Sequence, residues 1–159
     1  MEGVRYKASE GQLGRVMAIR LLPRTDLTEG IKKICEDYGV QHGFISCSMG
    51  SLQKATFMVT QPKPEAKMKV GYTDPIEVPG PVEFLGGHGW IGESEDGGRL
   101  IHFHGIVTDQ TGKSYGGHFV EGGNRSLLTI DLIIIELKGV RLVRKYDDEV
   151  GLIELDFLK

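Results

Sequence analysis

The spacing of apolar residues predicts one helix, from about Leu27 to Tyr38. Apolar side chains recur there every three or four positions, which places them on one face of a helix: Leu27, Ile31, Ile34, Cys35 and Tyr38. Asp26 stands in the N-cap position with Glu29 three residues later, and Gly39 follows the last apolar position. These residues are typical of a capping box and of a helix C-terminus.

Most of the remaining chain predicts strands. Apolar or alternating runs occupy residues 15–22, 43–48, 54–60, 82–91, 99–108, 114–121, 126–137, 140–146 and 151–158. We expect a turn around Met49 to Gln53. Residues 61–81 hold five of the six prolines, which predicts an irregular connection over an active site or a subunit neighbour. This order indicates one α+β domain over residues 1–159, with mainly antiparallel sheet around one principal helix.

The run LLTIDLIIIEL, residues 127–137, is apolar at nearly every position. An alternating strand would leave one face polar, so this pattern favours a central strand that is covered on both faces. The helix is expected on one side, and more sheet or another subunit on the other.

Composition narrows the class of protein. The chain has 159 residues, a formal charge of -3, and two cysteines, Cys35 and Cys47, with no Cys-x-x-Cys. No apolar run reaches the ~20 residues of a membrane span, and the charged N-terminus lacks the apolar centre of a secretion signal, so we expect a cytoplasmic protein. With only two cysteines and no paired motif, we expect both thiols to be buried and reduced. A negative net charge also argues against nucleic acid as the default partner.

Three of the five histidines fall in one segment, LIHFHGIVTDQTGKSYGGHFVEG, residues 100–122. His102 and His104 are two positions apart, so a strand directs both imidazoles to one face. His118 follows the turn-forming residues TDQTG, which can return the chain antiparallel. The neighbouring apolar residues predict that this strand is buried on both faces.

Three imidazoles with a free fourth position are the ligand set of an open zinc site. His102, His104 and His118 are therefore candidate metal ligands. Surface or singly hydrogen-bonded histidines remain the alternative, because His-x-His with a distant third histidine is a loose pattern.

Several longer segments resemble a known family, the PPC domain of plants and prokaryotes. They are RLLPRTDLTEGIKKICEDYGV, GFISCSMGSLQKATF, VEFLGGHGWI and HFHGIVTDQTGKSYGGHFVEGG. The resemblance covers roughly residues 15–157. Its most specific parts are Gly50-Ser51-Leu52 and the His-x-His … Gly-Gly-His segment.

The resemblance implies a trimeric α+β domain and a zinc held by His102, His104 and His118, with cobalt, nickel or iron as alternatives. The fold is also similar to that of acetolactate decarboxylase, which uses a three-histidine metal. Plant relatives bind DNA through an Arg-Gly-Arg-Pro element, which has no counterpart here. The chain departs from its relatives at His88, where they have a small or apolar residue. His88 is expected to be a hydrogen-bonding or surface histidine, with a contact to the metal as the alternative. His42 is expected to be surface or structural.

Two hypotheses follow. The first is a metal-dependent enzyme or binding protein for a small anionic or carbonyl ligand, with acid, base or donor candidates that spacing does not rank: Glu83, Asp109, Tyr115, Glu121 and Asp131. Asp131 could orient a ligand histidine, or it could be a charge at an edge or subunit contact. The second hypothesis is an oligomeric structural or regulatory module that acts through a partner protein or DNA, with a structural metal.

Overall fold

A computed structural model describes residues 3–158, apart from the side chain of Cys47. One helix, α1 (Leu27–Tyr38), accompanies ten strands in these residues: β1 (Gln12–Leu21), β2 (Gly43–Met58), β3 (Thr60–Pro62), β4 (Val70–Tyr72), β5 (Ile76–Ser94), β6 (Arg99–Thr108), β7 (Ser114–Phe119), β8 (Ser126–Lys138), β9 (Arg141–Asp147) and β10 (Leu152–Leu158). The predicted α+β class, with mainly antiparallel sheet and one helix, is confirmed.

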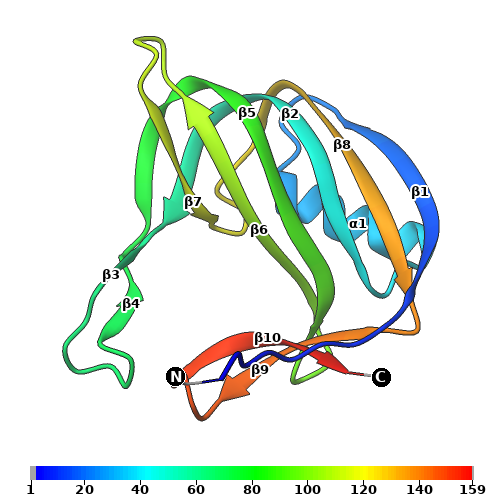
Figure 1. Cartoon of the computed structure of the whole chain (residues 1–159). Coiled ribbons are helices and arrows are strands. Elements are labelled where there is room, and N and C mark those ends of the chain that lie inside the picture. The colour runs from blue at the N-terminus through cyan, green and yellow to red at the C-terminus, as the bar shows by residue number, and fades with distance from the viewer. Residues whose placement is uncertain (1–2, 159) are drawn as a thin grey trace.

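Eight strands form one sheet in the order β1-β8-β2-β7-β6-β5-β9-β10. β2 also pairs with β5, so β2, β7, β6 and β5 form a closed ring of strand pairings. All pairings are antiparallel except the short contact between β5 and β9. Figure 1 shows α1 behind β2, β8 and β1, while β9 and β10 cross the lower end of the sheet.

The helix has the termini that its sequence predicts. The Asp26 carboxylate accepts hydrogen bonds from the backbone N–H groups of Thr28 and Glu29, and Gly39 ends the helix in the left-handed conformation with φ 65°. Leu27, Ile31 and Cys35 are buried, so this stripe faces the sheet. Tyr38 is 60% exposed, so its predicted place in the buried stripe is wrong: as the last residue of the helix, it leaves most of its side chain in solvent.

The turn predicted around Met49 to Gln53 is wrong, because β2 continues through it. The strand pairs with β8 on one side and β5 on the other, and its register shifts between Ser46 and Met49 and between Gly50 and Leu52. Gly50 permits this course: a Cβ there would lie 2.1 Å from the Thr129 carbonyl oxygen. The residues that suggested a turn form bulges within one long strand.

The prediction of an irregular connection over residues 61–81 is wrong in part. The strands β3 and β4 form a small hairpin within it, and β5 begins at Ile76. Pro79 and Pro81 are accommodated in β5 because the register with β2 shifts there, between Leu52 and Lys54. Prolines within a sheet occur at such irregularities, where no ladder hydrogen bond is required of them.

The sheet has a core face and an outer face. On β6, Ile101, Phe103 and Val107 are buried, whereas Ile106 on the other face is 53% exposed. The expectation that this strand is buried on both faces is therefore wrong. The core face carries a cluster of aromatic rings from three strands, in which Phe84, Phe103 and Phe119 have centroids 5.7–6.1 Å apart.

β8 shows the same division. Ile130, Leu132 and Ile134 are buried on the face toward the helix, whereas Ile133 and Ile135 on the outer face are half-buried. The outer face of β8 is therefore only partly covered. The contact of β10 lies on β5 instead, where Phe157 packs edge-on against Trp90 with ring centroids 5.7 Å apart.

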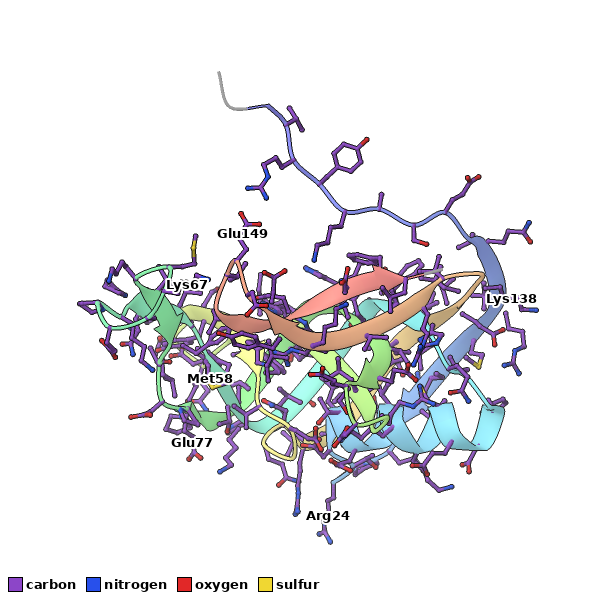
Figure 2. The ribbon with its side chains drawn as sticks, turned by 90° about the horizontal axis from the view of Figure 1, so that it is seen from below. Arg24, Met58, Lys67, Glu77, Lys138 and Glu149 are labelled. Carbon is purple, nitrogen blue, oxygen red and sulfur yellow. The ribbon has the colours of Figure 1, made fainter. Side chains whose placement is uncertain are left out.

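The β9–β10 hairpin is held in place by contacts at its turn. Arg5 donates two hydrogen bonds to the Glu149 carboxylate, and Lys67 donates one to the Asp148 carbonyl oxygen. Figure 2 shows Glu149 at this turn directed toward the extended N-terminal segment, with Lys67 nearby. The hairpin is thereby fixed over one end of the outer face. No helix in residues 3–158 has the length and apolar character needed to cross a membrane.

Candidate metal centre

A row of histidines crosses three neighbouring strands on the outer face. His104 on β6 pairs directly with His88 on β5 and with His118 on β7. His102 lies two positions before His104 and pairs with Trp90. Alternation along β6 and the β6–β7 register thus bring the three predicted ligands together, as the sequence indicates.

The ring nitrogens of this triad face one another. His102 Nε2 lies 3.0 Å from His104 Nε2, and His118 Nδ1 lies 3.4 Å from the same atom. All three candidate ligand atoms lie within 4.8 Å of one another. Tetrahedral zinc with Zn–N bonds of 2.0–2.1 Å separates its ligand nitrogens by about 3.3–3.4 Å. The group could therefore hold a metal ion.

The environment keeps the triad neutral. Burial, with the positive charges of neighbouring groups, lowers the pKa of His102 and of His118 from 6.5 to about 4. Burial, with His88 and Arg144, also lowers the pKa of His104. A metal binds imidazole only in its unprotonated form, so lone pairs are available to an ion at neutral pH.

One nitrogen of the triad lacks a partner. His102 Nδ1 is buried and makes no hydrogen bond to any described residue. Metal on Nε2 requires a proton on Nδ1, and this N–H group most often donates to a carboxylate, a carbonyl or a water. The described residues supply the ligand atoms of the site but no acceptor for this N–H group.

A β-bulge decides which side chains surround the triad. β5 has one more residue than β6 between the pairs Phe84–Val107 and Gly86–Ile106, so Leu85 is the extra residue. Val82 and Phe84 face the core before the bulge, whereas Ile91 faces it afterwards. Without the extra residue, His88 and Trp90 would face the core. The bulge turns both to the outer face.

A cavity of about 290 Å³ adjoins His104. Glycine backbone forms most of its wall, and His88, His104 and Ile106 supply the side chains. Gly105 leaves room on the opposite, core face, because a Cβ there would lie 2.6 Å from the buried Phe119 ring. His88 is exposed and is not among the described residues whose ligand atoms cluster. It therefore lines the cavity without completing the triad.

Two further side chains lie near the triad, and the sequence interpretation included neither. Tyr72, from β4, contacts the His118 ring with centroids 5.5 Å apart, so part of the proline-rich connection lies against the site. Arg144, from β9, contributes to the lowered pKa of each of the three histidines. Both belong to elements distant in sequence from the histidine segment, so no spacing pattern joins them to it.

The carboxylates suggested by the sequence are engaged elsewhere. Asp109 accepts hydrogen bonds from Thr111, Lys113 and Tyr115 within its turn, which lowers its pKa to about 2. Glu121 pairs with Lys32, and Asp131 with Arg20. Asp131 therefore does not orient a ligand histidine, because its oxygens are held by the Arg20 guanidinium.

The remaining candidates also fall away from the triad. Glu83 is exposed on β5, on the other side of the bulge from His88. His42 is half-buried and accepts a hydrogen bond from the Leu142 backbone at Nδ1, which fits the structural role expected for it.

Cys35 is free and buried, and burial raises the pKa of its thiol to about 11. The Cys47 side chain lies outside the described residues.

The family model of the Plants and Prokaryotes Conserved (PCC) domain matches residues 8–138. The match begins before the segment that resembles this family in sequence and ends before β9 and β10. Among curated proteins, the bifunctional protein GlmU of Synechococcus sp. (strain JA-3-3Ab) is 27% identical over 145 residues, which are 91% of this chain and 21% of that protein. The chain thus spans about a fifth of the length of this relative.

Solved structures share the fold. A metal-containing protein from Archaeoglobus fulgidus has a TM-score of 0.79 at 22% identity, covering 97% of this chain and 100% of that one. A plant- and prokaryote-conserved (PPC) protein from Pyrococcus horikoshii has a TM-score of 0.75 at 22% identity, with 94% and 97% covered. A protein from Ralstonia eutropha JMP134, proposed to bind DNA, has a TM-score of 0.71 at 24% identity, with 87% and 88% covered.

Proposed function

Because the chain belongs to the Plants and Prokaryotes Conserved (PCC) domain family, we propose that it binds one divalent metal ion through His102, His104 and His118 and presents the ion to a small anionic or carbonyl ligand. The observation that carries the proposal is the convergence of three ring nitrogens, with separations of 3.0 and 3.4 Å to His104 Nε2. The metal-containing relative from Archaeoglobus fulgidus supports it.

Zinc is the ion we favour. Three neutral imidazoles suit zinc in a tetrahedral site, and the fourth position stays open to water or a ligand. Cobalt, nickel and iron accept the same donors. When bound, such an ion supplies Lewis acidity: it polarises a carbonyl oxygen or lowers the pKa of a bound water.

The charge of the site sets the ligand class. The clustered donors in the described residues include no carboxylate, so the charge of a divalent ion would remain uncompensated. Arg144 adds a further positive charge near all three rings, and no ion pair of Arg144 occurs among the described residues. Such a site favours an anion or a carbonyl oxygen over a cation. Small keto and hydroxy acids satisfy this chemistry, and they are also the ligands expected if the resemblance to acetolactate decarboxylase holds.

Metal analysis of matched variants tests the proposal. The purified protein, reconstituted with zinc and dialysed, should hold about one ion per chain. His104→Ala should lose most of it, because His104 Nε2 is the atom that both other ligand nitrogens approach. His42→Ala is the control, since His42 makes a structural contact away from the triad. Equal metal content in the two variants would contradict the assignment.

We also propose that the chain assembles as a homotrimer, as its resemblance to the family implies. The fold supports this proposal because apolar side chains of the outer sheet face are exposed to solvent, where another chain could cover them: Val16 is 63% exposed and Met49 57% exposed. Light scattering should give the mass of three chains. A clean monomer at micromolar concentration would refute this proposal.

A second candidate function is a module within a larger protein, where the metal stabilises the domain and a partner protein or DNA is the target. The observation in its favour is that the chain matches only about a fifth of the GlmU relatives. The neighbour proposed to bind DNA shares the fold. Zinc-loaded protein that binds no small anion or carbonyl compound would favour this second function.

A further inference from the structure

The cavity beside His104 has one polar side chain that metal binding does not use. His88 lies directly across from His104 in the β5–β6 register and lines the same cavity of about 290 Å³. Its ring makes no hydrogen bond to a described residue. The ligand nitrogens of the triad cluster without His88, so the His88 ring nitrogens are free to contact a molecule in the cavity.

The position of His88 depends on a specific backbone feature. The extra residue Leu85 reverses the facing of β5, and the buried Ser48 hydroxyl donates to the Gly87 carbonyl oxygen at 2.8 Å just beyond it. Bulges commonly redirect side chains next to functional sites. Here the bulge moves a histidine from the core face to the rim of a cavity that His104 also lines.

We infer that His88 is a ligand-contact residue, whose imidazole donates a hydrogen bond to a carboxylate oxygen of the small acid held at the open metal position. The inference rests on the proposed function, since the metal anchors the other end of that ligand. Directly opposite side chains on paired strands have Cβ atoms about 4.5–5.5 Å apart. A molecule the size of a 2-oxo acid can therefore reach from a metal at His104 to the His88 ring.

The cavity also sets the size and shape of the ligand. Glycine backbone forms most of the wall, and Ile106 supplies an apolar side chain that is half exposed. With an ion held by the triad, the cavity beside His104 would offer the metal and the His88 donor to two oxygens, with an apolar surface for a short carbon chain. A 2-oxo or 2-hydroxy carboxylate of about three to five carbons has these groups, and its size suits a small pocket.

Calorimetric titration of the zinc-loaded protein with pyruvate tests the inference, with acetone as the neutral analogue. His88→Ala should weaken pyruvate binding about tenfold or more, the effect of one hydrogen bond to a charged group, while zinc content stays at the wild-type level. His88→Gln should recover much of the affinity because its amide also donates. Glu83→Ala, an exposed position on the same strand but outside this cavity, should bind as wild type.

The outcomes separate this inference from the proposed function. Wild-type pyruvate affinity in His88→Ala overturns the role of His88 and leaves the metal site standing. Loss of zinc in His88→Ala overturns it too, because His88 would then be a metal ligand. A zinc-loaded wild type that binds neither pyruvate nor any other small acid overturns the ligand half of the proposed function, and this inference with it.

Discussion

Metal binding should persist to an unusually low pH for a histidine site. The perturbation is a change from pH 7.5 to pH 5.5 in the metal-free protein before zinc is added. Burial lowers the pKa of His102 and of His118 from 6.5 to about 4. A lowered pKa means that each ring stays unprotonated as the pH falls, so protons compete with the metal only near pH 4.

The magnitude follows from the fraction of unprotonated rings. With an ordinary pKa, each imidazole would be about 9% unprotonated at pH 5.5, so three such rings would weaken zinc binding roughly a thousandfold. With the pKa of two rings at about 4, both are almost fully unprotonated at pH 5.5, so they reduce the zinc affinity very little. The pKa of His104 is lowered as well, so the whole loss should stay below about tenfold.

Equilibrium dialysis against buffered zinc at pH 7.5, 6.5 and 5.5, followed by elemental analysis, measures the affinity. Cobalt in place of zinc adds a visible absorption band that reports tetrahedral coordination at each pH. A fall of a hundredfold or more between pH 7.5 and 5.5 would refute the reasoning, since it would require rings that titrate near their ordinary pKa.

Three other results are expected. Without metal, the protein should lose thermal stability as the pH falls from 6.5 toward 4, because unfolded histidines take up protons that His102 and His118 do not; stability unchanged over this range would contradict the lowered pKa values. Asn124→Ala should lower the free energy of unfolding by about 3 kcal/mol in chemical denaturation, because the fully buried Asn124 amide bonds the Thr56 N–H and the Thr56 and Val120 carbonyls; the exposed Gln61→Ala should change it by less than about 0.5 kcal/mol. Duplex DNA should bind only weakly and with strong salt dependence, because the net charge is -3; tight binding at physiological salt, measured by fluorescence anisotropy, would favour the second function.

The helix and the histidine triad could be predicted because their signals are local. Asp26 and Gly39 mark the helix ends through contacts within a few residues. The triad needs only the alternation of His102 and His104 along one strand, and a turn that returns His118 to the neighbouring strand. That turn closes as its residues suggest, with Asp109 accepting from the backbone of Thr111 and Lys113.

The path of β2 and the facing of β5 could not be predicted, because both depend on partners far away in sequence. Gly50 looks like a turn residue until the Thr129 carbonyl of β8 is placed beside it. The alternation through Val82 and Phe84 would assign His88 to the core. The extra residue Leu85 reverses that assignment, and only the register with β6 reveals it.

Local sequence signals therefore predict one part of the site, and pairings between residues distant in sequence determine the other. The candidate metal ligands lie within one strand–turn–strand segment, whereas the other side chains near them come from three other elements: His88 from β5, Tyr72 from β4 and Arg144 from β9. Each of these three depends on a bulge, a hairpin or a distant strand pairing. Proteins with the same triad can consequently differ in the ligand that they select, because a change in one of those elements alters the cavity without moving a metal-binding histidine. The ligand of this chain must therefore be assigned from its own cavity, where His88 is the side chain that we infer to separate acids from their neutral analogues.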